Sequence, residues 1–238
     1  AYAIVTAHRT APPRDAEVRE LELGRAGAPA FDPLSADDLV GYWKFDENSG
    51  GSVADGSGRG HGGQFRGDAK WGAGKTGSGL VLAANDGFVE VGDAPDLCPA
   101  AITMAAWVNL PSMPTKAGNI VSKGQNGGYR FRVSNNGEVE VFDRGTENGL
   151  RTVEKVPLGQ WVHLAVTGDA TGLKIYVNGR LSVSNTVPYG APKVSHSLKI
   201  GAETDFQEFF GGSIDEVCLY KRSLTPSEVQ HLYRLGPK

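Results

Sequence analysis

Three carboxylates stand close together in the segment 138–143, which reads EVEVFD. Side chains of a β-strand alternate between two faces, so Glu138 and Glu140 share one face and Asp143 falls on the other. Two carboxylates on one face are the arrangement in which glycosidases hold an acid and a nucleophile ~5–5.5 Å apart. This pair is therefore the first place in the chain to look for acid–base chemistry.

A three-residue loop sets the register of that strand against the one before it. The loop 135–137 (Asn-Asn-Gly) is a favoured hairpin connection with glycine at the left-handed position. It places Val133 opposite Val139 and Arg132 opposite Glu140, and a shift of one residue would turn one apolar face outward. The pairing favours the charged form of Glu140, which makes it a poor proton donor. Such a pair can line a ligand surface or belong to a solvated sheet face.

Composition favours a β-rich globular chain without a nucleic-acid partner. Glycine supplies 33 of 238 residues, about twice its usual ~7% share, and it suits tight turns better than helices. The formal net charge is −3, and the sequence has no cluster of Lys and Arg to neutralise phosphates. No apolar stretch approaches the ~20 residues of a membrane span, and the first residues lack the apolar core of a signal peptide. We interpret the chain as a mature or excised piece of a larger protein.

Short apolar strands separated by turn signals recur from residue 39 onward, which is typical of a sandwich or barrel. In 129–133 (YRFRV), Tyr129, Phe131 and Val133 share one face and two arginines share the other. We expect strands at 39–45, 80–82, 88–91, 102–110, 119–123, 129–133, 139–142, 161–168, 174–177, 198–201 and 214–220.

One helix is expected near the end of the chain. Thr225 and Glu228 form a capping box around Pro226, apolar residues follow at helical spacing, and Gly236 ends the segment. We expect this helix to cover the edge of the sandwich.

Residues 1–38 differ from the rest of the chain. They hold two strand-like runs around a Pro-Pro-Arg-Asp turn, followed by a Gly-, Ala- and Pro-rich stretch typical of a linker. Two strands alone bury too little surface to be stable. We therefore divide the chain into an N-terminal hairpin or linker segment at 1–38, which could be the tail of an upstream domain, and a main domain at 39–238.

Six segments from about residue 39 to residue 235 carry a family likeness. They are LVGYWKFDENSGGSVADGSGRGHGG, ITMAAWVNL, NIVSKGQNGGYRFRV, PLGQWVHLAVTGDATGLKIYVNGRLS, SLKIGA and FFGGSIDEVCLYKRSLTPSEVQHLY. Taken in this order they resemble laminin-G-like jelly rolls of the concanavalin-A-like lectin/glucanase superfamily. The resemblance implies an all-β, two-sheet antiparallel jelly-roll sandwich with one short C-terminal helix. Members include lectins, carbohydrate-binding modules, hydrolases, lyases and adhesive domains, so the fold does not settle the function.

The catalytic motifs of that superfamily are missing from the sequence. Its hydrolases carry an E-x-D-x-x-E strand, whereas EVEVFD puts Asp143 on the wrong face. Its lyases carry Arg, Gln, His and Tyr motifs that this chain lacks. His163 stands where the family commonly has histidine, but no polar partner that would make it a base is evident. We therefore expect no catalytic residues, with an atypical hydrolase or lyase as an alternative.

The resemblance also implies a structural calcium site. Calcium takes 6–8 oxygen ligands, which carboxylates and loop carbonyls supply together. Carried over, the side-chain ligands are Asp46, which follows the first strand, and Asp215 of the IDEV segment. Carbonyls near Gly60 and His61 in the glycine-rich loop are the expected partners. Alternatively these are acidic turn residues only, and Asp55 folds onto its own loop.

A sugar site would combine aromatic platforms with planar polar groups. We expect Trp43, Trp107 and Trp161 to belong to the core, and Phe209 and Phe210 to close onto it. The candidate ligand-binding residues are Arg130, Arg132, Glu140, Asp143, Arg144 and Tyr189, with Phe206 as a further exposed aromatic.

Cys98 and Cys218 are either two buried free thiols or one disulfide that closes a loop of about 120 residues and implies an oxidising compartment. Together these features predict a calcium-stabilised, lectin-like module of a secreted or cell-surface protein, with a carbohydrate or glycoconjugate as its partner. A protein–protein adhesion or spacer domain is the remaining alternative.

Overall fold

The computed structural model describes residues 32–33, 37–124, 127–143 and 149–236. All of them belong to one of the two units into which the chain divides, Asp32–Lys238. The segment expected at 1–38 lies almost entirely outside the described residues, so the proposed boundary at residue 38 stays a prediction.

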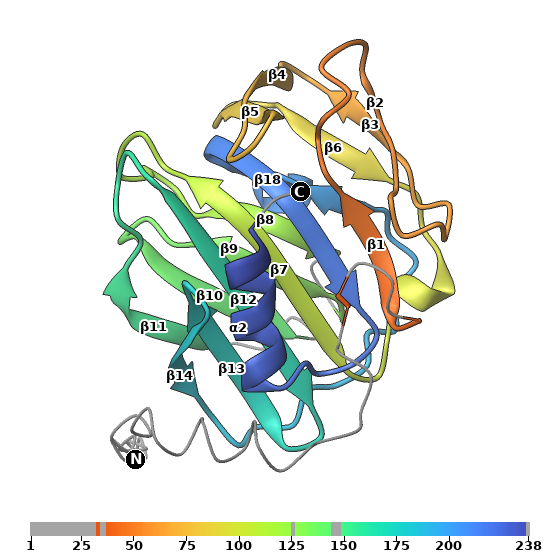
Figure 1. The fold of residues 1–238 in the computed structure, drawn as a ribbon, viewed down its shortest axis with the longest axis vertical. Helices are drawn as coiled ribbons and strands as arrows, with labels where there is room; N and C mark the ends of the chain where they lie inside the picture. The colour runs from red at the N-terminus through yellow and green to blue at the C-terminus, as the bar shows by residue number, and fades with distance from the viewer. Residues whose placement is uncertain (1–31, 34–36, 125–126, 144–148, 237–238) are drawn as a thin grey trace. The chain divides into compact units, whose positions relative to one another are not determined.

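Eight strands form one antiparallel sheet, sheet A, in which the last strand, β18, lies between β7 and β5 (Figure 1). The order is β14-β13-β12-β7-β18-β5-β4, and β1 also pairs with β18. The strands are β1 (Leu39–Trp43), β4 (Lys70–Ala73), β5 (Ser78–Ala83), β7 (Ile102–Asn109), β12 (Trp161–Asp169), β13 (Gly172–Val177), β14 (Arg180–Ser184) and β18 (Gly211–Tyr220).

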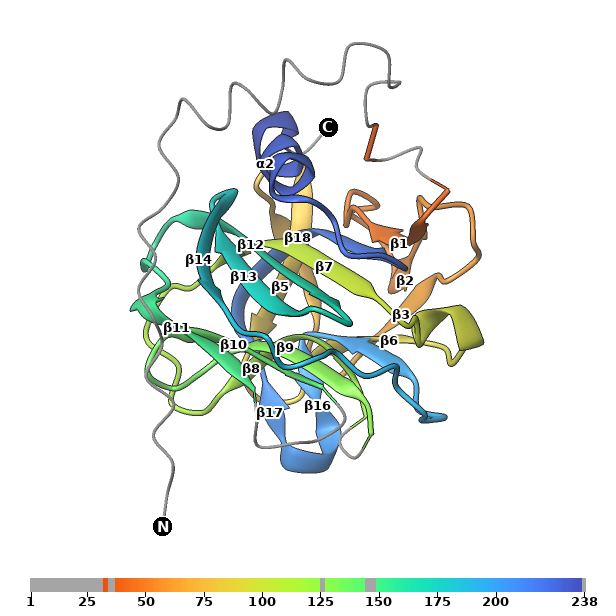
Figure 2. The same ribbon diagram turned by 90° about the horizontal axis from the view of Figure 1, so that it is seen from below.

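A second antiparallel sheet of eight strands, sheet B, packs face to face with sheet A (Figure 2). Its order is β11-β10-β9-β8-β15-β6-β3-β2. The strands are β2 (Ser52–Val53), β3 (Gly63–Arg66), β6 (Phe88–Val91), β8 (Gly118–Lys123), β9 (Tyr129–Val133), β10 (Glu138–Asp143), β11 (Leu150–Lys155) and β15 (Leu198–Ile200). The predicted two-sheet jelly-roll sandwich is confirmed.

Alternating side chains fill the space between the sheets. In β9, Tyr129, Phe131 and Val133 are buried in the core, while the two arginines between them face outward. Strands β7 and β12 are instead buried along almost their whole length. Both of their faces are covered, the inner one by sheet B and part of the outer one by the C-terminal helix.

The strands expected from the sequence are all present, with ends that differ by at most three residues. The sequence did not reveal β2, β3, β4, β11 and β14, which lie at or next to the sheet edges. Edge strands bury little apolar surface, so their sequences lack a clear alternating pattern. A short 3-10 helix, η1 (Pro95–Leu97), precedes β7.

The C-terminal helix α2 (Pro226–Leu235) has the predicted capping box. The Thr225 hydroxyl accepts from the Glu228 N–H at 3.3 Å, and the Glu228 carboxylate accepts from the Thr225 N–H at 2.7 Å. The expected position on the sandwich edge was wrong, because α2 lies across the outer face of sheet A (Figure 1). The Tyr233 ring lies 5.7 Å from Trp107 and 5.9 Å from His163. These two outward-facing rings give the helix an apolar surface to cover.

The capping box gives a first testable prediction. Thr225→Ala removes the hydroxyl that accepts the Glu228 N–H, so we expect the free energy of unfolding to fall by about 1 kcal/mol. Thr225→Ser keeps the hydroxyl and is the matched control. Urea titrations followed by circular dichroism measure both variants, and equal stability of the two would contradict the capping role.

A short hairpin at 202–209 lies on the outer face of sheet B (Figure 2). It consists of β16 (Ala202–Glu203), the 3-10 turn η2 (Thr204–Phe206) and β17 (Glu208–Phe209). Ser122 of β8 attaches it by donating to the Ala202 carbonyl at 2.6 Å. After the hairpin, Phe210 enters the core as expected, while Phe209 is only partly buried. We call this segment the 202–209 hairpin.

Candidate functional site

The outer face of sheet B carries the cross-strand pair expected from the sequence. Glu140 of β10 lies opposite Arg132 of β9, and the Arg132 Nε–Glu140 Oε2 distance is 2.8 Å. Val133 faces Val139 in the same register. The predicted pairing is confirmed, and Glu140 is only 3% exposed.

A second carboxylate reaches Arg132 from the 202–209 hairpin. Both oxygens of Glu208 accept from Arg132 Nη1 at 2.8 Å. Arg151 of β11 approaches the other oxygen of Glu140, at 3.2 Å. Together with Arg130, these side chains alternate in charge across the face. We call them the Arg–Glu network. Its members are Arg130, Arg132, Arg151, Glu140 and Glu208.

Arg130 has a looser ion pair than Arg132. Its Nη1 lies 3.7 Å from Glu208 Oε2, and its Nε is buried without a hydrogen-bond partner among the described residues. Its guanidinium carbon lies 4.9 Å from the ring centre of Phe142 and 5.1 Å from that of Phe206. Burial lowers the pKa of Arg130, and the charge of Arg132 lowers it further, against the opposite effect of nearby carboxylates.

Part of this face is open to solvent. Phe206, on the 202–209 hairpin, is 41% exposed, and the side chain of Glu208 is 19% exposed. Arg130 and Arg132 also keep partial exposure. The face therefore combines an accessible aromatic ring with planar donors and acceptors whose positions are held by their mutual contacts. Such a surface can bind a ligand that carries both apolar C–H groups and hydroxyls.

The other candidate ligand residues lie apart from that opening. Asp143 is buried, and its Oδ2 accepts from the Gly190 N–H at 2.8 Å. Tyr189 was expected to be exposed, but it is 5% exposed and belongs to the core. Its N–H donates to the Asp169 carbonyl at 2.9 Å, which turns its loop inward over Gly168. Arg144 lies outside the described residues.

The carboxylate pair of β10 is held by arginines. Both oxygens of Glu140 face guanidinium groups, one of Arg132 and one of Arg151. Glu138 lies at the far side of Arg151, with 4.0 Å between the nearest charged atoms. Glu140 is thereby positioned as a hydrogen-bond acceptor and not as a proton donor.

His163 is enclosed on the outer face of sheet A. Its ring lies 5.4 Å from the Trp107 ring, and α2 covers it through Tyr233. Burial lowers its pKa to about 4, and Nδ1 has no hydrogen-bond partner among the described residues. A small space beside it is also lined by Glu216, whose carboxylate accepts from the Tyr42 hydroxyl. This environment keeps His163 neutral and out of reach of a polymeric substrate.

Asp46 and Asp215, the two carboxylates predicted to bind calcium, border the same turn, 74–77, between β4 and β5. Asp215 Oδ2 accepts from the backbone N–H groups of Lys75 at 2.7 Å and of Thr76 at 3.4 Å. Asp46 Oδ1 accepts from the Ser78 N–H at 3.3 Å. Burial raises the pKa of Asp215 to about 7, and the negative charge of Asp46 adds to this effect.

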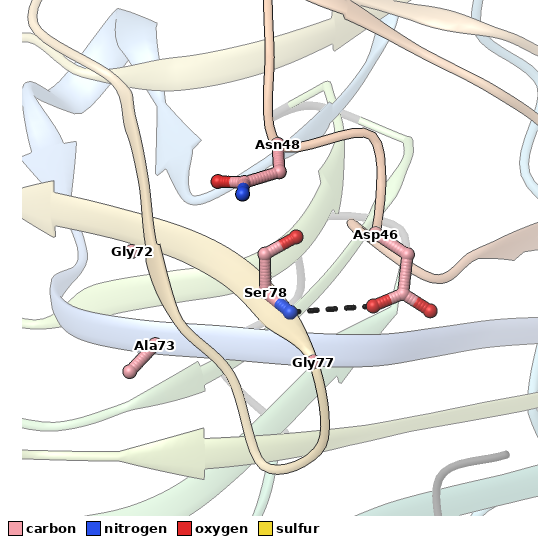
Figure 3. Close-up of a pocket in the computed structure, with 6 residues that line it drawn as sticks. All are labelled: Asp46, Asn48, Gly72, Ala73, Gly77 and Ser78. Carbon is pink, nitrogen blue, oxygen red and sulfur yellow. Dashed lines mark hydrogen bonds between the residues drawn. The ribbon is translucent and has the colours of Figure 1, made fainter.

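A shallow pocket of about 510 Å³ opens beside Asp46 (Figure 3). Asp46 and Asn48 enter it from the segment after β1, and Ser78 lies between them at the start of β5. Small residues of the β4–β5 hairpin form the remaining wall. The lining residues are Asp46, Asn48, Gly72, Ala73, Gly77 and Ser78.

The described contacts of the glycine-rich loop lead away from this pocket. The His61 carbonyl accepts from the Trp43 indole N–H at 2.7 Å, and His61 Nε2 lies 3.0 Å from Asp96. Asp55 accepts from the N–H groups of Ser57 and His61, so it folds onto its own loop. Among the described residues, the hydrogen bonds of His61 go to Trp43, Asp55 and Asp96 and not to the 74–77 turn. Within the described ranges, no group of three or more His, Cys, Asp or Glu side chains is placed to hold a metal.

The cysteines and tryptophans depart in part from expectation. Cys98 and Cys218 are free thiols, the first partly exposed and the second buried, so the disulfide alternative does not hold. Trp43 lies in the core as predicted. Trp107 is buried on the outer face of sheet A and not between the sheets, and Trp161 is only partly buried.

The fold defines the class of the protein: an antiparallel jelly-roll sandwich, one outer face of which carries polar and aromatic side chains. The sequence profile of the laminin-G-like branch of the concanavalin A-like lectin/glucanases superfamily matches residues 83–230. The chain belongs to this family.

Curated relatives are much longer than the chain. The human adhesion G-protein coupled receptor D1 is 32% identical over 122 residues, which are 47% of this chain and 13% of the receptor. Mouse usherin is 26% identical over 152 residues, which are 59% of this chain and 3% of usherin. The chain therefore spans about an eighth or less of these relatives.

Solved structures with the same fold include domains of enzymes and toxins. Domain 4 of AbnA, a GH43 extracellular arabinanase from Geobacillus stearothermophilus, in complex with arabinotriose, has a TM-score of 0.67 at 23% identity, covering 82% of this chain and 98% of that one. The binding domain of Paraclostridial Mosquitocidal Protein 1 has a TM-score of 0.68 at 17% identity, covering 84% and 52%. Trypanosoma rangeli sialidase has a TM-score of 0.66 at 19% identity, covering 88% and 35%. At these identities the likeness shows the fold alone. Of the helices in the described part of the chain, none has the length and apolar character needed to cross a membrane.

Proposed function

We propose that the chain is a non-catalytic, carbohydrate-binding module of a larger secreted or cell-surface protein. The observation that carries the proposal is the Arg–Glu network beside the accessible ring of Phe206 on the outer face of sheet B. Planar donors and acceptors match sugar hydroxyls, and an aromatic face matches the C–H groups of a sugar ring. The arabinanase domain solved with arabinotriose, which has the same fold, supports this choice of ligand class.

The relatives support the placement of the module outside the cell and within a longer protein. One is an adhesion receptor, and one structural neighbour belongs to an extracellular arabinanase. The chain corresponds to a small part of each curated relative. The two cysteines are not bonded to each other, so this placement rests on the relatives and not on a disulfide.

Calcium is the proposed structural cofactor, with Asp46 and Asp215 as the residues that would hold it. These carboxylates border one turn, and carboxylate oxygens are ligands that calcium prefers. Bound there, calcium would tie the segment after β1 to the β4–β5 hairpin and β18. Gly60 and His61 remain predictions as further ligands. The His61 carbonyl already accepts a hydrogen bond from Trp43.

Calcium removal is expected to lower the melting temperature. A ligand that binds only the folded protein stabilises it by about 2.7 kcal/mol at a concentration of 100 times Kd. Asp215→Ala should abolish the calcium dependence of the melting temperature, although it also weakens the 74–77 turn. Asp86→Ala, an exposed acid after β5, should leave that dependence intact. If fully demetallated wild-type protein has the same melting temperature with and without added calcium, the calcium site is ruled out.

A glycan array tests the binding function directly. The folded wild-type protein is applied with calcium and, in parallel, with a chelator. We expect a restricted set of glycans to be bound, with binding lost in Arg130→Ala. A blank array with folded protein would overturn the proposal.

A protein–protein adhesion role is the second candidate, because the human relative is an adhesion receptor. It predicts a blank array together with saturable binding to a protein ligand. Turnover of polysaccharides, lost in Glu140→Gln or His163→Phe, would instead favour an enzyme.

A further inference from the structure

We infer that the face formed by the Arg–Glu network and Phe206 selects neutral glycans and rejects glycans that carry carboxylate or sulfate groups. The inference rests on the proposed carbohydrate-binding function and specifies its ligand class. It follows from how the charges of this face are paired.

The arginines of this face are already committed to carboxylates of the protein. Arg132 donates to Glu140 through Nε and to both oxygens of Glu208 through Nη1, each at 2.8 Å. An acidic sugar that bound Arg132 through Nε or Nη1 would have to displace one of these partners. The displaced carboxylate would then stay partly buried with a more distant cation only, Arg151 at 3.2 Å from Glu140 or Arg130 at 3.7 Å from Glu208, which is unfavourable.

Among the described residues around the network, negative charge balances or exceeds positive charge. The network contains three guanidinium groups and two carboxylates, and Glu203 lies opposite Glu208 in the 202–209 hairpin with its side chain on the same face of the hairpin. Glu203 is fully buried, and its charge acts on Arg130. Glu138 lies at the far side of Arg151 and adds further negative charge. An anionic ligand is therefore attracted only weakly to this face. Neutral hydroxyl groups are not repelled by its carboxylates.

Three buried polar atoms near the hairpin lack a partner among the described residues: Arg130 Nε, Asn119 Oδ1 and Glu203 Oε2. One is a donor and two are acceptors. These atoms are buried, so an ordered water, which both donates and accepts, can satisfy either kind and bridge to a sugar hydroxyl. A carboxylate or sulfate only accepts, and it would repel the two oxygens.

Phe206 supplies the apolar part of the surface. It is 41% exposed, and its ring contacts the guanidinium of Arg130, which Phe142 supports from another side. The ring is thus held in place before a ligand arrives, which reduces the entropy lost on binding. The C–H face of a neutral sugar ring can pack on it, with hydroxyls reaching Arg130 and Glu208.

Calorimetric titration of the wild-type chain with matched neutral and charged oligosaccharides tests the inference. The probes are arabinotriose, lactose and cellotriose as neutral sugars, and sialyllactose and trigalacturonic acid as charged ones. We expect at least one neutral probe to bind, with an affinity at least tenfold above that of either charged probe. Its affinity should change less than twofold between 50 and 500 mM salt, because no net charge is neutralised. Tighter binding of a charged probe would overturn the inference and leave the carbohydrate-binding function standing, whereas binding of no probe and a blank glycan array would overturn both.

Two variants locate the site. Phe206→Ala should lower the affinity for the neutral probe at least tenfold. Leu181 is an exposed residue of sheet A, 47% accessible, and Leu181→Ala should leave that affinity unchanged. Glu208→Gln should raise the affinity for the charged probes several-fold, since it frees positive charge on Arg132. If Glu208→Gln fails to fold, the salt dependence of the wild-type protein decides the question. Neutral binding that is unaffected by Phe206→Ala would overturn the assignment to this face.

Discussion

Replacing Arg132 by alanine is expected to lower the free energy of unfolding by about 3 kcal/mol. The change leaves Glu140, 3% exposed, and Glu208 without their shared cation. Removing one partner of a buried ion pair costs about 3–5 kcal/mol, and the lower end applies because Arg132 is 15% exposed. Guanidinium chloride titrations followed by tryptophan fluorescence measure the loss.

Arg151→Ala is the matched control for Arg132→Ala. Arg151 contacts the same Glu140, but its side chain is 60% exposed, so its removal should cost less than about 1 kcal/mol. In a Glu140→Gln background, Arg132→Ala should cost less than in the wild type, because one of the stranded charges is gone. Equal losses for the two arginines would mean that the network is solvated and does not order this face.

His163 is expected to make the protein lose stability in acid between about pH 6.5 and pH 4. Burial lowers its pKa in the folded state to about 4, from an ordinary value of 6.5 in the unfolded chain. The unfolded chain therefore binds a proton at a higher pH than the folded one. The stabilising contribution is complete above pH 6.5 and is lost as the pH falls toward 4, by roughly 3 kcal/mol in total.

The measurement is the difference in unfolding free energy between wild type and His163→Phe at pH 7, 5.5 and 4.5. Phenylalanine keeps the ring contacts with Trp107 and Tyr233 and cannot take up a proton. As the pH falls, the unfolding free energy of the wild type should decrease relative to that of His163→Phe. Taking a difference is necessary because Glu216 lines the same small space and its pKa is raised to about 7, chiefly by burial, which acts in the opposite sense.

Local signals in the sequence were sufficient for most of the fold. The loop at 135–137 determines the register of β9 against β10, because a one-residue slip would expose a whole apolar face. The capping box likewise located the start of α2. What these signals could not show is where an element packs, so α2 was expected at an edge and lies instead on the outward rings of Trp107 and His163.

The candidate site was predicted only in part, because two of its six side chains, Glu208 and Phe206, come from a distant segment. Arg132 and Glu140 are eight residues apart and pair through a hairpin, whereas Glu208 reaches Arg132 from 76 residues away. A short hairpin with two-residue strands leaves no periodic pattern in the sequence. The prediction that Tyr189 is exposed was wrong for a related reason. The sequence of its loop gives no sign that the backbone hydrogen bond to Asp169 turns the ring inward.

The place of β18 in sheet A bears on how the chain is completed during synthesis. β18 is the last strand of sheet A to be made, yet it lies between β7 and β5 and also pairs with β1. Until residues 211–220 leave the ribosome, no strand connects the group β14-β13-β12-β7 to the pair β5-β4. A nascent or truncated chain would thus expose two open sheet edges, which are templates for aggregation. Folding of this domain therefore depends on residues 211–220, and a chain that stops before β18 would lack the strand that joins the two parts of sheet A.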